Sequence, residues 1–177
     1  MRMHGKIGLV TAAGSGMGKA GAIRFAQEGA SVGVVDINSD AVEAVVKEIK
    51  DAGGNAIGIV ADLTKDDESR YIVTKTANHF EGLDFVWNHI GYPGPASIEG
   101  IEMADFELTL DLNLRTILVT TEAALSEFRI RGGGSLLYTA SSSGLMGSGY
   151  SPVYSMAKFG VVGFTKALAK RVAKDNV

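Results

Sequence analysis

The feature of this sequence that most constrains its fold is a regular alternation of short apolar runs with longer amphipathic stretches. Strand-like runs occupy residues 7–11, 31–36, 56–60, 83–87 and 135–139. Helix-like stretches separate these runs, and a last one follows them. Strands that alternate with helices form βαβ units, in which helices cover both faces of a parallel sheet. Because crossovers are right-handed, we expect an α/β fold with a doubly wound parallel sheet, built as a three-layer α/β/α sandwich.

Capping residues predict where several helices begin. Ser39 and Thr64 are of the types that cap helix N-termini, and each precedes a helix-like stretch. A long helix is expected at about Ala104–Phe128, and a last helix at about Pro152–Lys174. Ser151 is expected as the N-cap of this last helix because the proline that follows suits a first helical turn.

Composition excludes several classes of function. The net charge of −3 gives no basic footprint for nucleic acid or anionic lipid. No apolar run approaches the ~18 residues that a membrane helix needs. The chain has no cysteine, which rules out thiol catalysis and fits a cytoplasmic protein. The three histidines, His4, His79 and His89, show no ligand spacing, so we expect no metal site.

A glycine-rich turn joins the first strand-like run to the first helix. It reads Gly14-Ser15-Gly16-Met17-Gly18. Glycines here let the backbone approach a pyrophosphate and let the helix pack close to the strand. The helix N-terminus offers free N–H groups and a partial positive charge to the phosphates. The motif therefore predicts a dinucleotide site, although an ordinary turn between a strand and a helix is the alternative.

Asp36 ends the second strand-like run, 22 residues after Gly14. An acidic side chain near that offset accepts hydrogen bonds from the ribose hydroxyls of the adenosine. It would repel the 2′-phosphate of NADP, and Ser15 supplies no cation to offset that repulsion. This favours NAD, unless Asp36 merely caps a helix or lies in a loop.

A possible proton-transfer pair is found at Tyr154 and Lys158. Residues four apart lie on one face of a helix, so the lysine can sit beneath the tyrosine. A free tyrosine is a poor base near neutrality, and a nearby ammonium favours its ionised form. Such a pair is common by chance. Ser141 favours the catalytic interpretation of the pair. This serine follows the fifth strand, at the edge where open α/β sheets bind ligands, and its hydroxyl can form a hydrogen bond with a substrate oxygen.

Taken together, these motifs resemble those of the short-chain dehydrogenase/reductase family, and the resemblance covers the whole chain. The family's glycine motif, Thr-Gly-x-x-x-Gly-x-Gly, matches at Thr11, Gly16 and Gly18, with Ala12 in place of the first glycine. Its Asn-Asn-Ala-Gly motif appears as Asn88-His89-Ile90-Gly91, with the first and last members retained.

The remaining matches complete the set of site residues that the resemblance implies. Asp62 matches the aspartate that approaches the adenine, and Ser141 lies 13 residues before the tyrosine, as in the family. The implied catalytic residues are Asn113, Ser141, Tyr154 and Lys158. The implied cofactor contacts are Gly14, Ser15, Gly16, Met17, Gly18, Asp36, Ile37, Asp62, Leu63, Asn88, Gly91, Tyr154 and Lys158.

The resemblance implies a Rossmann-like oxidoreductase that moves a hydride between NAD(H) and a secondary alcohol or ketone. Tyr154 would exchange the hydroxyl proton, and Asn113 would hold a water that links Lys158 to solvent. Such family members associate through their long helices, so we expect a homo-oligomer, either a dimer or a homotetramer, with a small-molecule substrate and no nucleic acid or membrane partner.

Two alternative functions stay open. An NADPH-linked 3-oxoacyl (acyl-carrier-protein) reductase would share the catalytic residues, and Asp36 argues against it. A non-catalytic nucleotide-binding or regulatory protein would explain the departures at Ala12 and at residues 88–91. His89 itself either packs within its loop or touches the cofactor or substrate.

The number of strands predicts that more chain follows. A Rossmann arrangement has six strands, whereas this sequence shows five and stops at Val177, where a sixth would begin. We therefore expect residues 1–177 to form a single dinucleotide-binding and catalytic domain that is incomplete at its C-terminus, with the C-terminal strands absent.

Overall fold

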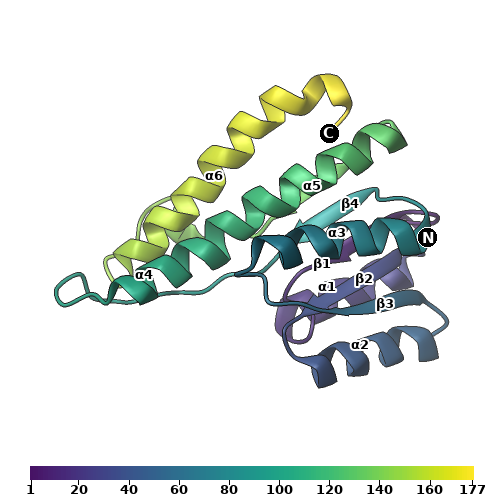
Figure 1. Ribbon diagram of the computed structural model, residues 1–177, viewed down its shortest axis with the longest axis horizontal. Helices are drawn as coiled ribbons and strands as arrows, with labels where there is room; N and C mark the ends of the chain where they lie inside the picture. The colour runs from purple at the N-terminus through teal and green to yellow at the C-terminus, as the bar shows by residue number, and fades with distance from the viewer.

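A five-stranded parallel sheet forms the centre of the computed structural model, which describes residues 1–177 (Figure 1). The strands are β1 (Ile7–Val10), β2 (Ser31–Asp36), β3 (Asn55–Val60), β4 (Phe85–Asn88) and β5 (Ser135–Tyr138). Their order across the sheet is β3-β2-β1-β4-β5, so the chain crosses from one side of β1 to the other between β3 and β4. This arrangement confirms the predicted doubly wound topology.

Helices follow the strands in sequence and cover the sheet. They are α1 (Gly16–Gln27), α2 (Ser39–Asp51), α3 (Asp66–Phe80), α4 (Met103–Leu110), α5 (Thr116–Arg131) and α6 (Pro152–Val172). Short 3₁₀ turns occur at Ser142–Gly144 and Ala173–Asp175. None of these helices combines the length and the apolar character that crossing a bilayer requires.

The core is divided into two layers by the sheet. Successive residues on a strand point to opposite faces, as Val34 and Val35 show. Val34 belongs to the buried cluster that includes Val45 of α2, whereas Val35 belongs to the cluster that includes Ile72 of α3 and Phe128 of α5. The helices therefore lie on both faces, which confirms the three-layer α/β/α sandwich.

The long helix expected at about Ala104–Phe128 is interrupted. Residues Asp111–Arg115 form a π-helical turn between α4 and α5. The N–H of Thr116 reaches back five residues to the carbonyl of Asp111, and its hydroxyl donates to the same carbonyl at 3.0 Å. A π-helical turn inserts one extra residue into a helix. The hydrophobic periodicity of the sequence cannot predict this insertion, because apolar side chains flank the turn on both sides.

Two of the predicted N-caps are wrong. The cap of α2 is Asn38, whose Oδ1 accepts from the N–H of Ala41 at 3.0 Å, and Ser39 is the first helical residue. The N-cap of α3 is Lys65, which makes no side-chain capping bond, and the Thr64 hydroxyl donates to Asp62 Oδ1 at 2.7 Å. Ser151 is the N-cap of α6 as predicted.

Candidate active site

The carboxyl ends of the parallel strands meet at one edge of the sheet, and the glycine-rich turn lies there after β1. The N–H of Gly14 donates to Asp36 Oδ2 at 2.9 Å, which joins this turn to the end of β2. Ser15 is the N-cap of α1 but makes no side-chain capping bond. The first turn of α1 also carries no acidic residue. Its N–H groups and partial positive charge therefore suit an anion such as a pyrophosphate.

Two glycines of this turn are required by geometry. Gly16 has a φ of +53°, in the left-handed region that favours glycine. A Cβ at Gly18 would lie 2.1 Å from the carbonyl oxygen of Ala12, so only glycine lets α1 approach β1 this closely. Ala12 itself has a φ of +51°, which is strained for an alanine.

A cavity of about 500 Å³ lies beside this turn. It is mostly apolar and is lined by Ala12, Asp36, Ile37, Ala61, Asp62, Leu63, Thr64, Ile90, Leu108 and Leu112. Four of the predicted cofactor contacts are therefore brought together in one cavity. Hydrogen bonds from the hydroxyl and N–H of Thr64 hold the pKa of Asp62 below its usual value, so this carboxylate stays charged. An apolar cavity with two carboxylates at its wall fits an adenosine and its ribose.

The most perturbed group near the end of β5 is Lys158. Its side chain is 1% exposed, and its Nζ donates to the carbonyl of Thr139 at 2.8 Å. Nζ also lies 5.4 Å from the centre of the Tyr154 ring, so the predicted pair does share a face of α6. Burial lowers the pKa of Lys158 from 10.5 to about 8. No carboxylate lies within ion-pair distance of this ammonium.

Asn113 lies within the π-helical turn and is completely buried. Its Nδ2 donates to the carbonyls of Tyr92 at 2.7 Å and Thr109 at 2.8 Å, which fixes the orientation of the amide. Its Oδ1 is left with no hydrogen-bond partner. A Cβ at Gly91 would lie 3.0 Å from this oxygen and 3.2 Å from Lys158 Nζ, so the three residues converge. An unpaired buried oxygen beside an ammonium fits an ordered water.

Ser141 lies in a segment that packs against α6. It is the N-cap of the 3₁₀ turn at Ser142–Gly144, and its Oγ accepts from the N–H of Ser143 at 3.1 Å. Gly144 lies so close to α6 that a Cβ there would be 2.6 Å from the carbonyl oxygen of Lys158. Ser141 makes no hydrogen bond with Tyr154, so its hydroxyl keeps its own proton for another acceptor.

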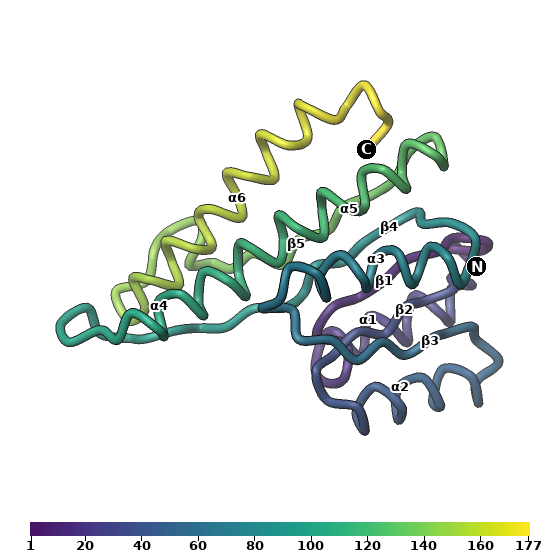
Figure 2. Tube along the Cα trace, viewed as in Figure 1, coloured from purple at the N-terminus to yellow at the C-terminus, as the bar shows by residue number.

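Other predicted contacts lie apart from the cavity. Asn88 is fully buried, and its Oδ1 accepts from the hydroxyl of Thr120 at 2.8 Å, so its side chain faces the protein interior. Met17 is 67% exposed at the start of α1. The N-terminal end of α6, which carries Tyr154, lies against α4 (Figure 2).

Thr139 is a site residue that the sequence did not predict. Its N–H donates to the carbonyl of Asn88 at 3.0 Å, its hydroxyl lies 2.9 Å from His89 Nδ1, and its carbonyl accepts from Lys158. Its position just after β5, two residues before Ser141, was the only signal in the sequence.

Thr11 also has a structural role that the sequence did not predict. The hydroxyl of Thr11 accepts from the N–H groups of His89 at 2.9 Å and Ile90 at 3.1 Å, and so joins the ends of β1 and β4.

The sequence matches a known protein family over nearly its whole length. Residues 6–177 match the family described as short chain dehydrogenase. The chain belongs to this family. Short-chain dehydrogenases are oxidoreductases that use nicotinamide cofactors, so the glycine-rich turn and the cavity beside it are features of a dinucleotide-binding fold.

Individual relatives agree with this assignment. An uncharacterized oxidoreductase of Thermotoga maritima is 36% identical over 169 residues, which cover 96% of this chain and 66% of that protein. The structure of a 7 alpha-hydroxysteroid dehydrogenase complexed with NADH and 7-oxo glycochenodeoxycholic acid is 31% identical with a TM-score of 0.95, and the match covers 99% of this chain and 68% of the other. The chain thus spans about two thirds of the length of these relatives.

A third relative differs in its cofactor. The structure of a short chain dehydrogenase from Burkholderia cenocepacia in complex with NADP has a TM-score of 0.94 at 30% identity. The match covers 99% of this chain and 72% of that one. Relatives of equal similarity therefore bind either nicotinamide dinucleotide.

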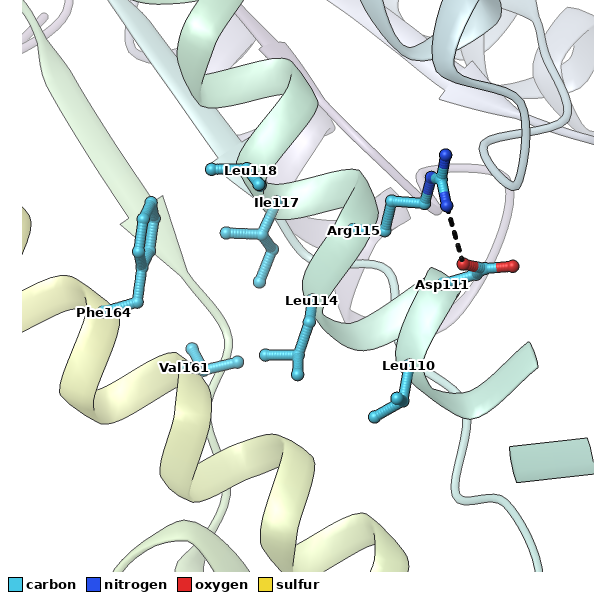
Figure 3. A pocket seen from close by; sticks show the side chains of 8 residues that line it. All are labelled: Leu110, Asp111, Leu114, Arg115, Ile117, Leu118, Val161 and Phe164. Atoms are coloured by element: carbon cyan, nitrogen blue, oxygen red, sulfur yellow. Dashed lines mark ion pairs between the residues drawn. The ribbon is translucent and has the colours of Figure 1, made fainter. Parts of the chain in front are cut away.

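A second cavity of this short-chain dehydrogenase has a volume of about 440 Å³ (Figure 3). It is an apolar groove between the π-helical turn with α5 and the middle of α6. Its lining residues are Leu110, Asp111, Leu114, Arg115, Ile117, Leu118, Val161 and Phe164. Asp111 and Arg115 form an ion pair at its rim at 4.0 Å.

Proposed function

We propose that this short-chain dehydrogenase transfers a hydride between NAD(H) and a secondary alcohol or ketone, with Asn113, Ser141, Tyr154 and Lys158 as its catalytic residues. The observation that carries the proposal is the burial of the Lys158 ammonium, without a counterion, beneath the Tyr154 ring. A buried and uncompensated ammonium is costly, and such groups cluster at functional sites. The 7 alpha-hydroxysteroid dehydrogenase relative, with its bound 7-oxo compound, supports this substrate class.

The proton would be handled by the residues around Tyr154. In alcohol oxidation the Tyr154 phenolate accepts the hydroxyl proton of the substrate. The Lys158 ammonium stabilises the negative charge of this phenolate before the proton arrives. The bound nicotinamide supplies the acceptor for the hydride that leaves the alcohol carbon. Ser141 donates its free hydroxyl proton to the substrate oxygen and so orients it. In ketone reduction the same proton returns to the substrate oxygen from Tyr154.

A water held by Asn113 would reconnect Lys158 to solvent. The Oδ1 of Asn113 is a buried acceptor without a partner, and it lies on the same side of Gly91 as Lys158 Nζ. A water there would accept from the ammonium and donate to the amide oxygen. This supports the assignment of Asn113 to proton relay, since its other amide atom already bonds two carbonyls.

NAD(H) is proposed over NADP(H) because of the charge at the adenosine cavity. Asp36 and Asp62 both line it, and no lysine or arginine does. A 2′-phosphate would therefore face carboxylates with no cation to bind it. This also argues against the NADPH-linked 3-oxoacyl reductase, which would otherwise use the same catalytic residues.

A turnover assay of the full-length protein tests the proposal. A panel of secondary alcohols with NAD⁺, followed by NADH absorbance, is expected to give turnover with at least one member. The reverse assay uses the matching ketones with NADH. Tight NADH binding without turnover on any member would favour the regulatory alternative.

We also propose that the protein forms a homo-oligomer, either a dimer or a tetramer, through α5 and α6. The groove in Figure 3 supports this, since Leu118 is 58% exposed at its wall and Phe164 lies across from it. Exposed apolar surface of this kind marks interaction sites on soluble proteins.

A further inference from the structure

The side chain of His89 lies at the point where three strand ends meet. Its backbone N–H is bound by the Thr11 hydroxyl after β1, and its ring contacts Trp87 of β4 at a centroid separation of 4.8 Å. The ring carbon Cδ2 would lie 3.0 Å from a Cβ at Gly18, so the ring also packs against the start of α1. The ring is therefore held in place on several sides.

The Thr139 hydroxyl links this ring to the next strand. Its Oγ1 lies 3.0 Å from Trp87 Nε1 and 2.9 Å from His89 Nδ1. An indole N–H can only donate, so Thr139 accepts from Trp87. The one proton of the hydroxyl is then available for His89 Nδ1, and in this arrangement the hydroxyl both accepts from Trp87 and donates to His89. The geometry assigns His89 the neutral tautomer with its proton on Nε2.

The same threonine holds the buried lysine through its backbone. The carbonyl of Thr139 is the only protein acceptor for Lys158 Nζ, at 2.8 Å. Trp87 and His89 thus hold the side chain of a residue whose carbonyl positions Lys158. Movement of Thr139 would move the ammonium relative to the Tyr154 ring.

We propose that His89 is a positioning residue, which in its neutral form fixes Thr139 and through it the Lys158 ammonium beneath Tyr154, and which releases Thr139 when it is protonated. The hydrogen-bonded arrangement stands on the geometry alone. Its effect on turnover rests on the function proposed above.

The surroundings of His89 oppose its protonation. An imidazolium would have to donate from Nδ1 to Thr139 Oγ1, which already accepts from Trp87, and the hydroxyl proton would lose its acceptor. Of the groups that face the ring, Lys158 of α6 is the only charged one, and it repels a second cation. The pKa of His89 is accordingly lowered from 6.5 by burial and by Lys158. Turnover should therefore fall on the acid side of pH 6.5, as His89 takes up a proton.

Two variants separate the hydrogen bond from the charge. His89→Asn keeps an oxygen acceptor for the Thr139 hydroxyl but cannot be protonated in this range. His89→Leu keeps the bulk and removes the acceptor. We expect His89→Asn to retain kcat near pH 7 and to lose the acid-side decrease. We expect His89→Leu to lower kcat about 10- to 100-fold, as misplacement of a catalytic group does, with little change in the KM for the alcohol.

Trp87 provides a readout that needs no turnover. It is the only tryptophan of the chain, and a protonated imidazole in contact with an indole quenches its fluorescence. We expect the Trp87 fluorescence of the protein without cofactor, taken as the difference between the wild type and Trp87→Phe, to show one transition below pH 6.5. This transition should vanish in His89→Asn and persist in His79→Asn, which changes an exposed histidine on α3 as the matched control.

The outcomes distinguish the proposal for His89 from the proposed function. Loss of the fluorescence transition in His89→Asn supports the arrangement whether or not turnover is found, and a wild type without turnover overturns the proposed function only. A transition that persists in His89→Asn overturns the assignment of His89. So does a His89→Leu protein with wild-type kcat and pH profile, or one whose melting temperature falls while its pH profile is unchanged, because that would show a merely structural role.

Discussion

The backbone N–H of Gly14 donates to Oδ2 of Asp36 at 2.9 Å, so one carboxylate both orients the glycine-rich turn and lines the cavity of about 500 Å³ beside it. These two tasks can be separated by substitution. Asparagine at position 36 keeps an oxygen that can accept from Gly14, whereas alanine removes the acceptor as well as the charge.

Changing the charge at position 36 should change the cofactor preference. We expect wild-type kcat/KM to favour NAD(H) over NADP(H) strongly, and Asp36→Asn combined with Ile37→Arg to shift the ratio toward NADP(H) by at least about tenfold, or about 1.4 kcal/mol. Asp36→Ala with the same arginine should shift it too, but with weaker binding of both cofactors. Steady-state kinetics with each cofactor measure the ratio, and comparable wild-type values for both would contradict the assignment of Asp36.

Removal of the Tyr154 hydroxyl should abolish most turnover. Tyr154→Phe deletes the proton-transfer group and keeps the ring that covers Lys158, so kcat is expected to fall ~10²–10⁴-fold while NADH binding stays nearly unchanged. Titration of NADH by fluorescence provides the control. Activity within a few fold of wild type would remove Tyr154 from the mechanism.

Relief of the backbone strain at Ala12 should stabilise the protein. Its φ of +51° is costly for alanine and free for glycine, so Ala12→Gly is expected to raise the free energy of unfolding by about 1 kcal/mol. The matched control is Ala13→Gly, at a buried position without a positive φ, which should be destabilising. Urea unfolding measures both. A loss of stability in Ala12→Gly would show that the alanine methyl contributes more packing than its strain costs.

Removal of the buried Lys158 ammonium should also stabilise the protein, and the gain in stability should depend on pH. Lys158 has a folded pKa of about 8 against 10.5 when unfolded, so the cost of burying its ammonium is fully present below pH 8 and disappears as the pH rises toward 10.5. Lys158→Met should therefore melt at a higher temperature than wild type near pH 7, by about 2–4 °C for each kcal/mol gained, and the difference should vanish near pH 10.5.

The same variant should lose turnover, because stability and activity oppose each other at this site. Lys166→Met, at an exposed lysine of the same helix, is the control and should leave both quantities unchanged. A lower melting temperature for Lys158→Met near pH 7 would mean that the bond to Thr139 outweighs the cost of burial.

A charge placed in the apolar groove should dissociate the proposed oligomer. Leu118→Arg adds a cation to an exposed position on α5 that a second copy would cover. We expect the wild type to sediment as a dimer or tetramer and the variant as a monomer with an unchanged circular dichroism spectrum. A wild type that sediments as a monomer would exclude this interface.

The order of the elements was predictable because each strand is a short apolar run and each run is followed by a helix signal. Tyr154 and Lys158 could be paired from their spacing on one helix. Gly14 and Asp36 could be paired because the spacing between the glycine-rich turn and an acidic residue at the end of the next strand is typical of dinucleotide sites. The contacts of Thr139 could not, because they depend on the meeting of β4, β5 and α6, which are far apart in the chain. The cap at Asn38 was missed because Ser39 beside it is an equally suitable type.

The π-helical turn at Asp111–Arg115 has a consequence for how relatives of this protein can diverge. Each residue of a helix advances about 100° around its axis, so losing one residue from this turn would rotate Asn113 away from Lys158, or else rotate all of α5 relative to the sheet. Substitutions here can be absorbed one side chain at a time, but insertions and deletions cannot. The length of the segment between α4 and α5 should therefore vary less among active homologues than its composition does.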